Sequence, residues 1–146
     1  MTSTTLNNVD NITDKAYPHN NSGLMTYRDL SGFAGGGNLR SNLSDLAKYV
    51  QAQINASNIN SLGQAILQSQ ESTIQINLKD HFALGWEFYY TSTNKELIFK
   101  NGISPGFTAA IAFDKDTKKA IITLFNNFRS NNPGVRYLTL IEEYFK

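Results

Sequence analysis

Apolar positions first follow a helical period, between residues 43 and 54. There the apolar side chains recur every three or four positions, so they would form a single stripe on a helix. The stripe consists of Leu43, Leu46, Ala47, Val50 and Ile54. Asn42 stands where it can cap the first turn, and Asp45 lies at the helix end that favours a negative charge. The sequence therefore predicts a helix that begins directly after Asn42.

Two further helices are predicted from weaker patterns. One covers about residues 59–70, where Leu62 and Ile66 are expected to face inward. The other follows a Pro-Gly pair and ends near Phe145 at the C-terminus. Its apolar positions again fall on one face of a helix.

The pattern changes to a strand period between these two helices. We predict four strands, over residues 82–90, 96–100, 107–113 and 119–125. Gly85 interrupts the first strand, and Trp86 is expected to pack in the core. Short polar connections make consecutive strands antiparallel neighbours. The last strand is almost continuously apolar, which predicts a central position in the sheet.

The order of these elements indicates an α+β fold: an antiparallel sheet of about four strands flanked by helices. The beginning of the chain differs in composition, since it is rich in Asn, Thr and Ser. We expect an irregular polar lead-in over residues 1–33. Residues 34–38 are expected to form a glycine-rich loop before the first helix. Residues 34–146 are then the folded part of the chain.

Composition excludes several classes of function. The chain has 146 residues, of which 40% are hydrophobic, enough for one domain with a core. A net charge of +1 gives no attraction to nucleic acid, and no segment is apolar enough to span a bilayer. Cysteine is absent, and the two histidines, His19 and His81, lie far apart in the sequence. We therefore expect neither a metal nor another cofactor.

A lysine and two glycines lie between two of the predicted strands, in residues 100–107. In an acyl-transfer site, a cation fixed at a strand edge can bind a substrate carboxylate and polarise a neighbouring serine. Lys100 has this position. Gly102 would let a flat substrate lie against the strand, and the Ile103 N–H would be free to meet a developing oxyanion. A lysine at a strand end is more often only a solvated charge, so the surrounding pattern has to decide.

Four stretches of the chain resemble, in order, motifs of the class C β-lactamase-like serine hydrolases. This family also includes D-alanyl-D-alanine carboxypeptidases and esterases. Residues 35–50 resemble its Gly-Gly-Leu-x-Ser-Thr segment and the Asp-Leu-Ala that follows, and residues 84–86 resemble its Gly-Leu-Gly-Trp strand. Residues 100–107 resemble Lys-Thr-Gly with a following Gly-Phe, and residues 112–126 resemble its last hairpin. The resemblance covers residues 34–146 and leaves out the lead-in.

The resemblance implies part of a β-lactamase/transpeptidase-like fold and four candidate catalytic residues. Lys100 matches the motif lysine, which contacts the nucleophile and the substrate carboxylate region. Ile103 matches the position whose N–H supplies half of the oxyanion hole, and Gly102 matches the motif glycine. Asn101 stands where Thr or Ser is commonest. Its carboxamide can still donate a hydrogen bond, but this departure argues against strict β-lactam specificity.

The motif that carries the family's nucleophile is missing from the place where the resemblance requires it. A Ser-x-x-Lys at the start of a helix belongs upstream of every matched stretch, as does a Tyr-x-Asn or Ser-x-Asn loop. Residues 92–95 spell Ser-x-x-Lys and begin with Ser-x-Asn, but they lie in a predicted polar turn just before Lys100. We therefore interpret the chain as the C-terminal portion of a serine hydrolase. The parent would act on a β-lactam, a D-Ala-D-Ala peptide or an ester through an acyl-enzyme, and this portion is expected to be inactive alone.

The alternative interpretation is a natural truncated module of the same fold that binds or assembles without catalysis. A Ser-x-x-Lys in the reading frame upstream would distinguish the two. For the hydrolase, the expected partners are a small-molecule acyl substrate and the missing N-terminal half. The sheet edge and apolar surface left without that half predict a homodimer. Family resemblance, not the sequence itself, implies a periplasmic or extracellular location.

Overall fold

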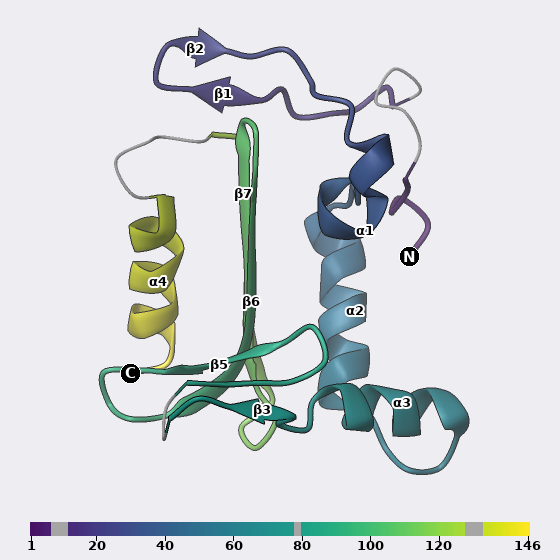
Figure 1. The fold of residues 1–146 in the computed structure, drawn as a ribbon, viewed down its shortest axis with the longest axis vertical. Helices are drawn as coiled ribbons and strands as arrows, with labels where there is room; N and C mark the ends of the chain where they lie inside the picture. Colours follow the sequence, from purple (N-terminus) through teal and green to yellow (C-terminus); the bar gives the residue numbers. More distant parts are fainter. Residues whose placement is uncertain (7–11, 78–79, 128–132) are drawn as a thin grey trace.

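The computed structural model describes residues 1–6, 12–77, 80–127 and 133–146, and it confirms the α+β class. Six antiparallel strands form one sheet in the order β3-β4-β5-β6-β7-β8, with helices on both sides (Figure 1). The strands are β3 (Ile74–Gln75), β4 (His81–Phe82), β5 (Glu87–Tyr90), β6 (Glu96–Ser104), β7 (Phe107–Asp114) and β8 (Lys119–Phe125). Strands β6 and β7 form the long central hairpin on which the candidate site lies.

Three helices of two turns or more accompany the sheet: α2 (Leu43–Ile54), α3 (Ser61–Ser69) and α4 (Pro133–Tyr144). The side chain of Asn42 accepts a hydrogen bond of 2.9 Å from the Asp45 amide, so the predicted cap is confirmed. Asn60 caps α3 in the same way, through the Gly63 amide at 2.8 Å. Both helices therefore begin where a side chain satisfies a free N–H group.

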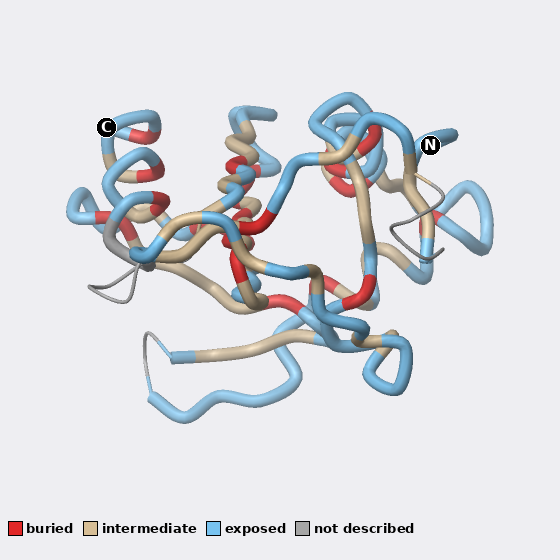
Figure 2. Tube along the Cα trace, turned by 90° about the horizontal axis from the view of Figure 1, so that it is seen from above, coloured by how far each residue is buried: buried red, intermediate tan, exposed pale blue. Residues whose placement is uncertain are grey.

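The core consists of two apolar layers, one on each face of the sheet. Helix α4 packs on one face and α2 on the other (Figure 1). The buried positions follow the strands and the inner sides of the helices (Figure 2). The α4 layer contains Leu97, Phe99, Ala110, Ala112, Tyr137, Ile141 and Phe145, and the α2 layer contains Val50, Trp86, Ile98 and Phe113. The core position expected for Trp86 is confirmed, because only 6% of it is exposed.

The strand predicted over residues 82–90 is wrong as a single element. Gly85 adopts a φ of +85°, a conformation that L side chains rarely adopt, and the chain turns there. The two sides of this turn pair with each other as β4 and β5, with Phe82 opposite Glu87. Strand β3 adds to β4, so the sheet has two strands more than expected.

The central position predicted for the last strand is also wrong. In the part of the chain that the structure describes, β8 pairs only with β7 and forms an edge of the sheet. Its apolar run has another cause, since both of its faces are covered. Ile121 and Phe125 pack in the α4 layer, whereas Ala120 and Ile122 pack in the α2 layer. A continuous apolar run in a strand indicates that both faces of the strand are covered. It does not indicate that the strand pairs with a neighbour on each edge.

The lead-in contains ordered elements that the sequence did not predict. It forms a hairpin of β1 (His19–Asn20) and β2 (Gly23–Leu24), followed by a 3₁₀ turn, η2 (Ser31–Phe33). The expected glycine loop is a single helical turn, α1 (Ala34–Gly37). The β1–β2 hairpin lies beside the tip of the β6–β7 hairpin (Figure 1). The boundary between the lead-in and the folded part, placed at residues 33/34, stays a prediction.

Parts of the helices expected to face inward are exposed. Leu43 on α2 is 54% exposed and Leu62 on α3 is 69% exposed, so the inward position predicted for Leu62 is wrong. Polar side chains occupy the buried positions nearby. Gln70 donates to the carbonyl oxygen of Gln53 at 3.1 Å and to its side-chain oxygen at 2.8 Å. The apolar stripe of α2 is therefore only partly used for packing within the described chain.

Candidate functional site

The four candidate residues lie on a stretch of β6 that has a strand on one side only. Strand β5 pairs with residues 96–99 of β6, and its first residue, Glu87, stands opposite Phe99. Beyond that point residues 100–104 pair with β7, while none of the described strands covers their other edge. Figure 1 shows the β6–β7 hairpin continuing well past β5. The sequence motif thus lies along an open strand edge, where backbone groups are available to a ligand.

Lys100 is held at the start of this open edge by an ion pair. Its Nζ lies 2.8 Å from Glu87 Oε1, and the two side chains are 48% and 33% exposed. An ion pair this exposed contributes little to stability, about 0–1 kcal/mol. In this arrangement the ammonium group lies beside Glu87, at the start of the open edge. An anionic ligand at this edge would have to share Lys100 with Glu87.

Asn101 points away from Lys100. Side chains alternate along a strand, and Asn101 has the parity of Leu97 and Phe99, which belong to the α4 layer. Its Nδ2 donates to the Tyr137 hydroxyl on α4 at 2.5 Å. The carboxamide is therefore used within the fold, on the face opposite to that of Ile98. The structure brings Lys100 and the open edge together and leaves the Asn101 side chain out.

The Ile103 amide faces the open edge, as strand geometry requires. Ser104 and Phe107 are joined by a two-residue loop, so they form a hydrogen-bonded pair with each other. In an antiparallel ladder such pairs alternate with pairs that point their N–H and C=O groups outward. Ile103, opposite Thr108, belongs to the outward-pointing kind. Its N–H can therefore meet an oxygen atom that approaches the edge.

Gly102 provides open space at the same edge. A Cβ atom built on Gly102 would find no atom within 4 Å. The strand surface between Lys100 and Ile103 is therefore flat. This matches the expectation that a planar group could lie against the strand there.

The lead-in fixes the tip of the hairpin that carries this site, and sequence reasoning missed this contact. Gly106 has a φ of +83°, and a Cβ on it would lie 2.2 Å from the Pro18 Cβ. The His19 amide donates to the Gly106 carbonyl at 3.3 Å, and the rings of Tyr27 and Phe107 are stacked with centroids 6.1 Å apart. Pro18 is fully buried. The one available signal was the adjacent Pro-Gly pair in the hairpin loop, which shows the turn but not its partner.

Asn126, which follows the last strand, also contacts the lead-in. Asn126 Nδ2 donates to the Tyr17 carbonyl at 3.2 Å, and His19 Nδ1 lies 3.2 Å from the Asn126 carbonyl. Its side chain therefore satisfies a backbone carbonyl of a segment more than one hundred positions earlier.

The serine and the lysine of the Ser-x-x-Lys at residues 92–95 contact different side chains. The Ser92 hydroxyl donates to Glu142 at 2.7 Å, whereas Lys95 Nζ lies 2.6 Å from Asp114. Burial of Asp114 disfavours its charge, but hydrogen bonds from Lys95 and Thr117 outweigh this and lower its pKa to about 2. The hydrogen bonds from Tyr89 and Ser92 lower the pKa of Glu142 as well. Serine and lysine serve different carboxylates, so the lysine is not placed to take the serine proton.

Metal-ligand groups and membrane-spanning helices were also sought among the described residues. Over the ranges given above, no three His, Cys, Asp or Glu side chains are grouped as metal ligands. Over the same ranges, no helix has the length and apolar character needed to cross a membrane.

Comparison with known proteins gives one family and one fold. The beta-lactamase family model matches residues 1–145, so the match includes the lead-in. No curated protein sequence matches. Three similar solved structures align with nearly the whole of this chain, at low sequence identity. A beta-lactamase/D-alanine carboxypeptidase from Pseudomonas syringae has 19% identity and a TM-score of 0.81, and the match covers 98% of this chain and 48% of that one.

The other two structures are class C beta-lactamases. A single-residue mutant of such an enzyme has 20% identity and a TM-score of 0.77, with 97% of this chain and 46% of that chain covered. A further class C beta-lactamase has 20% identity and a TM-score of 0.75, with 98% and 47% covered. At this identity the likeness shows the fold alone. The chain spans about half the length of each of these structures.

Proposed function

The chain belongs to the beta-lactamase family, and from that premise we propose that it is the C-terminal portion of a serine hydrolase that cleaves acyl donors. The substrate class is a β-lactam, a D-Ala-D-Ala peptide or an ester, attacked through an acyl-enzyme. One observation carries the proposal: residues 100–103 lie on the part of β6 whose outer edge is left open where β5 begins. That edge offers a cation and an outward N–H within four residues.

The proposed division of labour follows from the geometry of this edge. A serine from the other half of the parent would attack the acyl carbon, and negative charge would develop on the carbonyl oxygen. The Ile103 N–H would donate one hydrogen bond to that oxygen, in a position fixed before the reaction begins. Lys100 would stabilise the developing charge and hold the carboxylate end of the substrate. Glu87 would keep the ammonium group at the edge before substrate arrives.

The isolated chain is not expected to catalyse the acyl-enzyme reaction proposed for the parent. The Ser-x-x-Lys that its sequence contains places each residue on a different carboxylate. Without nucleophile and base, only the binding and electrostatic contributions remain. We expect residues 100–103 to support turnover of neither a chromogenic cephalosporin nor a p-nitrophenyl ester, and no serine to be labelled by a fluorescent penicillin. Stoichiometric acylation of Ser92 by the penicillin would contradict this.

The decisive experiment expresses the upstream reading frame and this chain as one polypeptide and measures cephalosporin turnover. Lys100→Ala should lose roughly 2–4 kcal/mol of transition-state stabilisation, a loss of about 30- to 1,000-fold in kcat/KM. Lys119→Ala is the matched control, because Lys119 is also an exposed lysine at a strand end. It should leave kcat/KM unchanged. Wild-type kcat/KM in Lys100→Ala would remove Lys100 from the site.

A further inference from the structure

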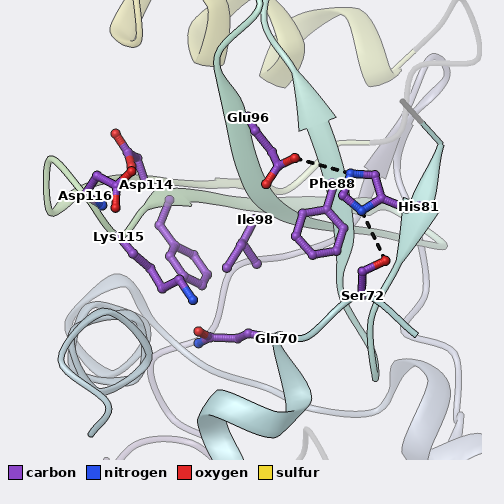
Figure 3. A pocket seen from close by; sticks show the side chains of 10 residues that line it. Gln70, Ser72, His81, Phe88, Glu96, Ile98, Asp114, Lys115 and Asp116 are labelled. Atoms are coloured by element: carbon purple, nitrogen blue, oxygen red, sulfur yellow. Dashed lines mark hydrogen bonds and ion pairs between the residues drawn. The ribbon is translucent and has the colours of Figure 1, made fainter. Parts of the chain in front are cut away.

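A second candidate site lies on the sheet near α3, and residues 100–103 are not part of it. It is a pocket of about 330 Å³ (Figure 3). Its apolar lining, the floor of the pocket, comes from Phe88, Ile98 and Phe113. Ser72 and His81 stand at one side of it (Figure 3). Ser72 lies just before β3, and His81 begins β4. The unpredicted small strands therefore create this pocket, and no motif in the sequence pointed to it.

His81 links a hydroxyl group to a carboxylate in this pocket. Its Nδ1 lies 3.2 Å from Ser72 Oγ, and its Nε2 lies 3.3 Å from Glu96 Oε2 and 2.9 Å from Tyr90 Oη. The ring stacks on Phe88 with centroids 4.1 Å apart and an angle of 6° between the planes. Only 13% of the His81 side chain is exposed. Stacking and hydrogen bonds together hold the imidazole in one orientation.

The network assigns the position of the proton on His81. The Tyr90 hydroxyl donates to Glu96 Oε2, and this hydrogen bond, with burial, raises the pKa of Tyr90 to about 12. Tyr90 has only one proton to donate, so its oxygen must accept from His81 Nε2. The neutral imidazole therefore carries its proton on Nε2. Nδ1 is left with a lone pair, which accepts a hydrogen bond from Ser72 Oγ.

Ser72, His81 and Glu96 thus have the arrangement of a nucleophile, a base and a carboxylate that orients the base. The lone pair of His81 Nδ1 points at Ser72, and Glu96 lies on the other side of the ring. We propose that Ser72 is a nucleophile activated by His81, and that it takes the acyl group of small uncharged esters. The chain would thus carry an esterase-like activity at a site separate from residues 100–103, in contrast to the expectation from sequence that it is inactive alone. Glu96 and Tyr90 act as positioning residues, since they contact His81 and not the ester.

The reaction balances with these groups alone. Ser72 Oγ forms a bond to the ester carbonyl carbon while its proton moves to His81 Nδ1. The bond between that carbon and the alcohol oxygen breaks, and the leaving oxygen takes the proton from His81. Water then repeats the sequence at the acyl-serine and releases the carboxylic acid. Glu96 stabilises the imidazolium ion that forms in each half of the reaction.

The lining of the pocket selects the class of ester. The apolar floor suits a short alkyl or aryl acyl group. The carboxylates of Glu96, Asp114 and Asp116 line the same pocket, so an anionic ester would be repelled. Lys115 also lines it, on the side opposite Ser72 and His81 (Figure 3). A small neutral ester therefore fits better than a carboxylate-bearing β-lactam.

The test uses p-nitrophenyl butyrate as the probe on the chain as it is. We expect a burst of about one p-nitrophenolate per chain, and a butyryl group on the tryptic peptide that contains Ser72. Ser72→Ala should abolish both. His81→Ala should slow acylation by about 100-fold, the lower range for loss of a general base. Added imidazole should restore part of the rate in His81→Ala, which a purely structural role of His81 would not allow.

Ser92→Ala is the matched control, because the Ser92 hydroxyl donates to Glu142 and has no histidine beside it. It should acylate at the wild-type rate. Near-ultraviolet circular dichroism of each variant establishes that its fold is retained. The proposal is overturned if the chain is not acylated, if Ser72→Ala is acylated at the wild-type rate, or if imidazole has no effect on His81→Ala.

Discussion

The direction of one backbone amide decides what the β6 edge can do. Ile103 and Gly102 are adjacent, but only the Gly102 amide belongs to a pair that bonds to β7. Proline removes an N–H group, so Gly102→Pro should break a ladder bond, whereas Ile103→Pro should not. We expect Gly102→Pro to cost about 1–3 kcal/mol more in the free energy of unfolding. Urea unfolding of both variants measures this difference, and equal losses would show that the Ile103 amide is bonded within the sheet.

Three glycines allow backbone strain to be separated from steric contact. Gly102 has neither a positive φ nor a neighbour within 4 Å, Gly85 has a φ of +85° and no neighbour, and Gly106 has both a φ of +83° and contact with Pro18. Gly102→Ala should be nearly neutral for stability. Gly85→Ala should cost about 1–2 kcal/mol for the left-handed conformation. Gly106→Ala should cost more than Gly85→Ala, because buried Pro18 would have to move.

Thermal and urea unfolding of the three alanine variants checks this order. If Gly106→Ala loses no more than Gly85→Ala, the lead-in does not press on the hairpin tip. The glycine of the Gly-Phe motif would then be required by the turn alone. The result bears on the site, because this turn sets the position of Ile103.

At the scale of elements, an ion pair joins two turns at the same end of the sheet, the β5–β6 turn and the β7–β8 turn. Lys95 precedes β6 and Asp114 ends β7, and their Nζ and Oδ2 atoms lie 2.6 Å apart. The pKa of Asp114 falls from 3.8 to about 2 in the folded chain. A carboxyl group with a lowered folded pKa stabilises the fold above its unfolded pKa and loses that contribution as pH falls through its folded pKa. The contribution of Asp114 should therefore be complete at neutral pH and decline between about pH 4 and pH 2.

Asp114→Asn tests this contact. At neutral pH the variant should lose on the order of 1–3 kcal/mol in the free energy of unfolding, the range for a buried hydrogen bond to a charged group. The difference from wild type should shrink as the pH is lowered towards 2. Asp116→Asn is the control, since Asp116 lies in the same turn and is exposed. A difference that stays constant with pH would show that the charge of Asp114 does not stabilise the fold.

Local sequence signals predicted the long elements of the fold and little of what joins them. Helix α2 could be predicted because a cap and a stripe of apolar residues agree, and Asn42 caps it as expected. The β1–β2 hairpin could not, because it has no apolar pattern of its own and depends on contacts with Gly106 and Asn126. The edge position of β8 was missed because burial by two helices gives the same apolar run as a central strand.

The candidate site shows the same division between what is local and what is not. The motif placed Lys100 and Ile103 on one strand, and the two-residue loop after Ser104 sets which way the amide points. Nothing local indicated Glu87 as the partner of Lys100, or Tyr137 as the partner of Asn101. Those contacts depend on how neighbouring strands and α4 are placed. That these residues share one strand was predictable from the sequence, while the direction of each side chain was not.

At the scale of the whole molecule, much apolar surface is left without cover in the described part of the chain. Leu43 and Leu62 are more than half exposed, and Leu124 on β8 is 41% exposed. Strand β8 also presents an unpaired edge among the described strands. Only 17% of the residues are charged, so little opposes association. Uncovered strand edges and apolar patches of this kind tend to pair with another chain.

We therefore predict that the isolated chain forms a two-fold dimer, in which either the β8 edges or the exposed helix surfaces cover each other. Light scattering at micromolar concentration should give twice the mass of one chain. Leu124→Lys should shift the equilibrium towards monomer if the strand edge is the interface, and Leu62→Lys should do so if the helices are. Gln51→Lys adds the same charge on the exposed polar side of α2 and should leave the dimer intact. A monomer with sharp thermal unfolding would contradict the prediction and favour a self-sufficient domain, because a fragment cut from a larger core should not be stable with its apolar surface in water.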